Sequence, residues 1–180
     1  MSIENIISLL AALGVGGILG AVLNSHLEQR KQTKEHDLKI FRESDEILRE
    51  LRLSDIANVL FGDHSIDRDD FYRLTQWCEF FEETGKQYLD KRLIKQSQEL
   101  LQVLTQLTYF IATNFFTMRD QNPRITRKYL KPDFNIDRGD PSPEQEAAYR
   151  RYADELQQLT MTARKQYTKY RFAIKQTLMV

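Results

Sequence analysis

The chain opens with a long apolar stretch and continues as a series of amphipathic patterns. Residues 6–23 read IISLLAALGVGGILGAVL, with no charged side chain and one polar side chain, Ser8. As a helix this stretch would be about 27 Å long, close to the ~30 Å hydrocarbon core of a bilayer. Because it is apolar on every side, we predict a transmembrane anchor at residues 1–24. The alternatives are a buried helix of a soluble domain and a cleaved signal peptide, which normally has basic residues before its apolar stretch.

The charges flanking the apolar stretch predict its orientation. Glu4 precedes it, whereas Arg30, Lys31 and Lys34 follow it. Under the positive-inside rule, residues 25–180 then lie in the cytoplasm, and the chain is a single-pass protein of the inner or plasma membrane. A single cysteine, Cys78, and the lack of any Asn-x-Ser/Thr sequence fit a reducing compartment.

Small residues recur inside the apolar stretch at intervals of four. Ser8, Ala12, Gly16 and Gly20 would form one ridge along a helix. Such a ridge lets two helix backbones approach closely in lipid, where the hydrophobic effect does not drive helices together. The ridge predicts transmembrane packing between copies of this chain, and therefore a homo-oligomer. Glycine is also common in membrane helices for other reasons, which is the alternative interpretation.

Beyond residue 24 the hydrophobic positions follow a helical period in four segments. Helices are predicted at residues 27–61, 67–85, 93–118 and 142–180, and the polar residues 25–37 are predicted to be a juxtamembrane stalk. No run alternates like a strand. The predicted fold class is therefore all-α: a single N-terminal transmembrane helix followed by a cytoplasmic antiparallel four-helix bundle. A long basic loop, residues 119–141, precedes the last helix.

Hydrophobic stripes on two predicted helices indicate the core, and an N-cap sequence indicates where the last helix begins. The second predicted helix carries an aromatic stripe around Trp77 that includes Cys78, which is therefore expected to be a buried, unreactive thiol. The third carries a mostly aliphatic stripe. Ser142, with Pro143 and Gln145 after it, fits a capping box with proline in the first turn. The two stripes consist of Phe71, Leu74, Trp77, Cys78 and Phe81, and of Leu100, Leu104, Leu107, Ile111 and Phe115.

Composition and motifs limit the chemistry. The 180 residues include 26 Lys+Arg and 26 Asp+Glu, and a net charge of zero argues against nucleic acid as the main partner. The chain has no phosphate-binding glycine loop, no GxSxG and no HExxH. His64, with Asp63 and Asp67, is better explained as a capping turn than as a metal site. No catalytic residue, metal or cofactor is predicted, so we do not expect an enzyme.

A basic segment in the predicted loop is the candidate ligand site. Basic and aromatic side chains alternate there, a combination that binds phosphates, anionic headgroups or nucleotides. A solvated loop balanced by nearby aspartates is the alternative. The basic second half of the last helix could serve the same ligand or face the acidic residues 63–90. The candidate ligand-binding residues are Arg124, Arg127, Lys128 and Lys131.

These features predict a membrane-anchored, non-enzymatic interaction or effector module. It would self-associate through its transmembrane helix and sense a protein partner or a small anionic ligand with the bundle. The layout resembles that of small bacterial membrane proteins, some of which are accessory or effector components of phage-defence systems. The likeness is one of architecture and transfers no residue role. The alternative function is a binding module for a nucleotide or nucleic acid that uses residues 119–131.

Overall fold

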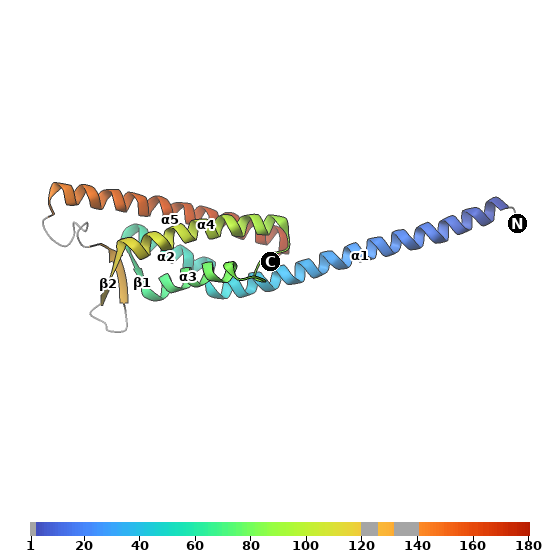
Figure 1. Cartoon of the computed structure of the whole chain (residues 1–180), viewed down its shortest axis with the longest axis horizontal. Coiled ribbons are helices and arrows are strands. Elements are labelled where there is room, and N and C mark those ends of the chain that lie inside the picture. The colour runs from blue at the N-terminus through green and yellow to red at the C-terminus, as the bar shows by residue number, and fades with distance from the viewer. Residues whose placement is uncertain (1–2, 120–125, 132–140) are drawn as a thin grey trace.

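The protein is mostly helical and contains one small sheet (Figure 1). The computed structural model describes residues 3–119, 126–131 and 141–180, and side chains from residue 21 onward except 118 and 119. The helices in these ranges are α1 (Ile3–Ile47), α2 (Glu50–Gly62), α3 (Arg68–Glu82), α4 (Lys91–Asn114) and α5 (Pro143–Leu178). The strands are β1 (Ser65–Asp67), β2 (Phe115–Arg119) and β3 (Thr126–Leu130). The prediction of a helical protein is confirmed, and the prediction of an all-α four-helix bundle is wrong.

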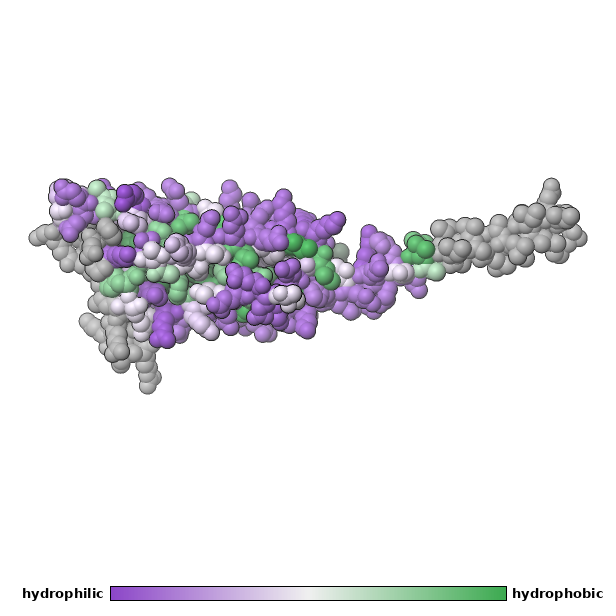
Figure 2. Space-filling view, viewed as in Figure 1, coloured by the Kyte–Doolittle hydropathy of each residue, from purple (hydrophilic) through white to green (hydrophobic). Residues whose placement is uncertain are grey.

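Helix α1 projects from the rest of the molecule. Its C-terminal end packs against the other helices, and its N-terminal part extends away from them as a single rod (Figure 1). Residues 21–32 are exposed at every position. We call α2–α5, the sheet and residues 36–47 of α1 the body. Most of the visible surface of the body is hydrophilic (Figure 2). On the rod, the apolar side chains of Val22 and Leu23 are 60% and 62% exposed.

The predicted transmembrane segment lies almost entirely outside the residues whose side chains are described. This is true of its four small residues, Ser8, Ala12, Gly16 and Gly20. Within the described residues, no helix has an apolar stretch of the length and hydropathy that a membrane crossing requires. The anchor at residues 1–24 therefore stays a prediction.

The predicted helix at 27–61 is in fact two helices. Helix α1 ends after Ile47, Arg49 is extended at φ −73° and ψ 154°, and α2 begins at Glu50. The buried positions explain the break. If the α1 face that buries Leu48 continued, it would bury Leu51, yet Leu51 is 81% exposed. The buried face of α2 is shifted by two residues and consists of Leu53, Ile56, Ala57 and Leu60.

The core lies between α2, α3, α4, α5 and the C-terminal part of α1, and it contains most members of the two predicted stripes. Trp77 is 1% exposed and packs against Phe81 and Tyr170 at ring-centroid distances of 4.5 and 5.9 Å. Helices α4 and α5 lie side by side and antiparallel (Figure 1). The Ser142 side chain accepts a hydrogen bond from the Gln145 amide, and the Gln145 side chain accepts one from the Ser142 amide. The expected capping box is therefore confirmed.

Part of the predicted basic loop forms a sheet instead. The strands pair antiparallel in the order β1-β3-β2, with Tyr129 opposite both Ser65 and Phe116. The helix predicted to reach Met118 stops at Asn114, and β2 begins at Phe115. Aromatic residues favour strands once a partner strand and a core are available, and one face of the sheet buries Ile66, Phe115 and Leu130. The strands were missed because β1 has three residues and β2 and β3 have five each.

The shifted face of α2 can be tested with two leucines of one helix. We expect Leu60→Ala, at a fully buried position, to lower the free energy of unfolding by about 2–5 kcal/mol. Leu51→Ala, at the exposed position, should change it by less than about 0.5 kcal/mol. Urea unfolding followed by Trp77 fluorescence measures both. An equal loss in the two variants would indicate that the α1 face continues through residue 51.

Candidate functional site

The place where α1 enters the body contains a group of buried and half-buried polar contacts, and we call it the joint. Asp37 of α1 is fully buried, and its carboxylate oxygens accept hydrogen bonds from the amides of Leu89 and Asp90 at 2.7 and 3.0 Å. Asp90 in turn caps α4 by accepting from the amides of Arg92 and Leu93. A buried carboxylate is tolerated only when it is hydrogen-bonded. The entry of α1 is therefore coupled to the start of α4.

Surface contacts beside Asp37 strengthen this attachment. The Nε2 atom of His36 lies 3.0 Å from the carbonyl oxygen of Gln87. The Lys86 ammonium donates to the Glu43 carboxylate at 2.6 Å, and this hydrogen bond holds the pKa of Glu43 below its usual value and raises that of Lys86. Residues 86–90 thus bind α1 on two successive turns.

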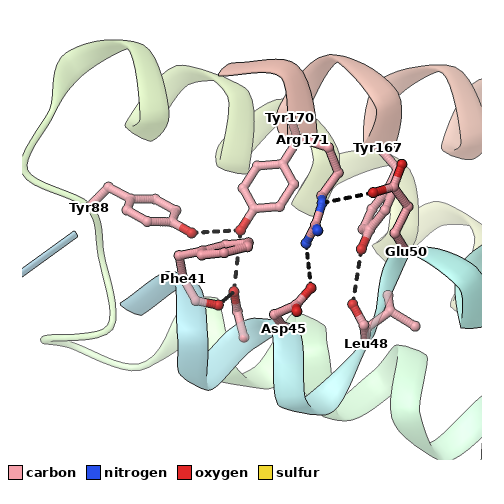
Figure 3. A network of polar contacts seen from close by, with 9 residues as sticks. Phe41, Asp45, Leu48, Glu50, Tyr88, Tyr167, Tyr170 and Arg171 are labelled. Carbon is pink, nitrogen blue, oxygen red and sulfur yellow. Dashed lines mark hydrogen bonds and ion pairs between the residues drawn. The ribbon is translucent and has the colours of Figure 1, made fainter. Parts of the chain in front are cut away.

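A cluster of tyrosine hydroxyls joins α5 to α1 in the interior (Figure 3). The hydroxyl of Tyr170 lies 2.6 Å from that of Tyr88 and 3.3 Å from the Ser44 hydroxyl. All three side chains are buried, and burial raises the pKa of Tyr170 to about 12. The hydroxyls therefore stay neutral at physiological pH, and each can serve as donor or acceptor for its neighbour.

Arg171 and Tyr167 of α5 fix the break between α1 and α2 (Figure 3). The Arg171 guanidinium pairs with Asp45 of α1 and, at 3.4 Å, with Glu50 of α2. It also stacks over the Phe41 ring, 4.9 Å from the centroid. The Tyr167 hydroxyl donates to the carbonyl of Leu48, the last residue before the break, at 3.0 Å. One helix therefore holds both sides of the break.

A crevice of about 500 Å³ opens at the base of the projecting rod. It lies between α1 and the C-terminal end of α5, where Leu178 lines it. Its α1 wall carries His26, Arg30 and Lys34, which form no ion pair within the described part of the chain. The crevice is open to solvent, and its lining combines the basic side chains of Arg30 and Lys34 with the carboxylates of Asp37 and Asp90.

The predicted ligand-binding residues that the structure describes lie on β3 or directly after it. Arg127 of β3 pairs with Asp67 of β1 at 2.9 Å, and the Lys128 ammonium lies 5.0 Å from the centroid of the Phe71 ring. The backbone amide of Lys131 donates to the carbonyl of Asn114. Arg124 lies outside the described residues. Two of the four side chains thus have partners within the fold, and anion binding by this group stays a prediction.

The candidate reactive groups have structural roles. Among the described residues no three side chains of His, Cys, Asp or Glu are grouped as a metal site would require. His64, with a positive φ of 47°, forms a hydrogen bond through Nδ1 with the Tyr149 hydroxyl. Burial raises the pKa of Cys78 to about 11, so the thiolate needed for reaction is scarce at neutral pH.

Sequence reasoning missed the joint because its members are far apart in the chain. Tyr170 and Ser44 are separated by 126 positions, as are Arg171 and Asp45. The basic part of the last helix was predicted either to serve the ligand of the loop or to face residues 63–90, and its Arg171 pairs with Asp45 and Glu50. The available signal was local: Tyr167, Tyr170 and Arg171 lie on one face of α5 among polar neighbours. Comparisons with models of protein families, with curated proteins and with solved structures found no match for this chain.

Removal of the Arg171 guanidinium should loosen the joint. Arg171→Met leaves Asp45 without its partner, and we expect a loss of about 2–4 kcal/mol in the free energy of unfolding. Arg164→Met, at an exposed position of the same helix, should cost less than about 0.5 kcal/mol. Urea unfolding of both variants provides the comparison. A loss in Arg171→Met no larger than in this control would show that the ion pairs contribute nothing measurable.

Proposed function

We propose that the protein is a membrane-anchored, non-enzymatic interaction module. It self-associates through its N-terminal helix and presents the body to a partner or ligand in the cytoplasm. The observation that carries this proposal is the continuity of α1, one helix of 45 residues that runs from the apolar residues 6–23 into the joint. Residues 21–32 of this helix have no cover from the body.

The physical argument concerns what stabilises the far end of such a helix. A helix without tertiary contacts is marginal in water, and one that is apolar on every side would expose that surface to solvent. Insertion into hydrocarbon removes the apolar surface from water and satisfies every backbone group internally. The sequence of residues 6–23 therefore supports a bilayer as the environment of this part of α1.

The joint would let the proposed anchor set the distance and orientation of the body as well as attach it. Residues 24–36 form thirteen exposed or half-buried helical positions between the apolar stretch and the body, which correspond to about 20 Å along the axis. Because Asp37 and Arg171 fix α1 to the body, the body is held at a set distance and orientation below the proposed membrane. Arg30 and Lys34 lie on the side where anionic lipid headgroups favour cations.

Membrane attachment is tested by fractionation of cells that express the chain. We expect the full chain to stay with the membranes after a carbonate wash, because residues 6–23 are within hydrocarbon. A chain without residues 1–24 should move to the supernatant and keep a helical circular-dichroism spectrum. A control that keeps the length but carries Val15→Lys and Ile18→Lys should behave like the deletion. Release of the full chain by carbonate would contradict the anchor.

Self-association is tested at the ridge of small residues. We expect Gly16→Leu with Gly20→Leu to reduce the size of the detergent-solubilised particle, because leucine prevents close approach of two helices. Gly14→Leu with Gly17→Leu adds the same bulk off the ridge and should leave the particle unchanged. Size-exclusion chromatography with light scattering gives the mass of each. Equal masses for both double variants and the parent would remove the ridge from the proposal.

A further inference from the structure

A second crevice lies on the other side of the joint, at the break between α1 and α2. It has a volume of about 440 Å³ and is formed by the last turn of α1, the start of α2 and the first turns of α3. This volume is within the range of small-molecule sites, about 300–1,000 Å³. The lining residues are Glu46, Ile47, Arg49, Arg52, Asp69 and Arg73.

Three guanidinium groups share this crevice, and within the described residues an ion-pair partner is seen for one of them, Arg52. Arg52 donates to the buried carboxylate of Asp70 at 2.6 Å, which fixes its side chain. Arg49 and Arg73 are exposed and form no ion pair within the described part of the chain. Like charges gathered around one opening repel each other unless an anion lies between them. Arg49 and Arg73 are therefore available to contact an anion, beside Arg52, whose side chain Asp70 holds in place.

The backbone at this crevice adds N–H groups, which carry partial positive charge like the arginine side chains. Arg49 is the N-cap of α2 and makes no side-chain cap hydrogen bond. An arginine has no acceptor with which to cap a helix, so the first-turn amides of α2 receive nothing from it. The N-terminal end of α2, where the helix dipole is positive, therefore begins at a residue that lines the crevice. The lining also holds two carboxylates, Glu46 and Asp69, beside its three arginines, and Arg52 is already paired with Asp70.

We propose that the arginine crevice binds a small anion that carries phosphate groups. Guanidinium groups bind phosphate oxygens through paired hydrogen bonds, and Arg49, the residue before α2, lines the same opening as Arg73 of α3. The choice of a soluble anion over a lipid headgroup rests on the proposed function. Ile47 is about 36 Å along α1 from Leu23, whereas the headgroup layer is roughly 5–8 Å thick.

The shape of the site favours a small molecule over a nucleic acid. Nucleic-acid surfaces carry rows of cations that follow the phosphate backbone over several nucleotides. Here the available cations converge on one opening, and the chain has a net charge of zero. An anion with two or three linked phosphates would place oxygens near both Arg49 and Arg73.

The test uses the full chain in detergent micelles with inorganic tripolyphosphate as the probe, at constant ionic strength. Isothermal titration calorimetry should show saturable binding. Arg49→Gln with Arg73→Gln should weaken it by at least about tenfold, because each lost charged hydrogen bond contributes to affinity. Arg92→Gln with Arg164→Gln removes the same charge from exposed positions elsewhere and should leave binding unchanged. Circular dichroism checks that both variants keep their helices, and the two single variants replace the double one if it unfolds.

Several outcomes would overturn the assignment. They are the absence of saturable binding at millimolar tripolyphosphate, an equal effect of the two double variants, and tighter binding of a single-stranded oligonucleotide. Binding only to vesicles that contain phosphatidylglycerol would assign the arginines to lipid instead. The membrane anchor does not take part in the calorimetric measurement. Absence of binding in calorimetry would contradict the anion site and leave the anchor standing. Release of the chain by carbonate would contradict the anchor and leave the calorimetric result unaffected.

Discussion

Helix α1 is held at one end, and the polar contacts made there decide how all of its earlier residues are oriented. Asp37 accepts two backbone hydrogen bonds from the 86–90 segment, and Arg171 forms ion pairs on both sides of the break after α1. A buried carboxylate or guanidinium left alone would destabilise the fold, so these groups favour one arrangement over others. Their partners lie more than fifty positions away, which means that α1 acquires its orientation only when the body has folded.

Local patterns in the sequence predicted much of the body. Trp77 and Cys78 were expected inside and are buried, because bulky residues at helical spacing leave few other arrangements. The leucines of α4 were predicted for the same reason, and Ser142 with Gln145 formed the cap that its residue types favour. In each case the deciding residues lie within a few turns of one another.

The features that could not be predicted depend on contacts between distant segments. The break after Ile47 has no proline or glycine to indicate it, and it follows from the different faces that α1 and α2 bury against their neighbours. The strands β1 and β3 are short, and Ile66 and Leu130 become core residues only when the two pair. The arginine crevice is likewise a product of folding, because Arg49 and Arg73 are 24 positions apart in the chain and line one opening only in the folded body.

The length of α1 gives the joint a mechanical consequence. From Asp37 back to Ile6 the helix covers about 47 Å, so a rotation of about 10° at the joint would displace the far end by about 8 Å. The same geometry acts in reverse. A sideways force on the far end exerts a torque on the contacts of Asp37, Asp45 and Arg171, and this torque grows with the length of the helix. A rod attached in this way behaves as a lever, and its fulcrum is the group of polar contacts that α1 makes with residues 86–90 and with α5.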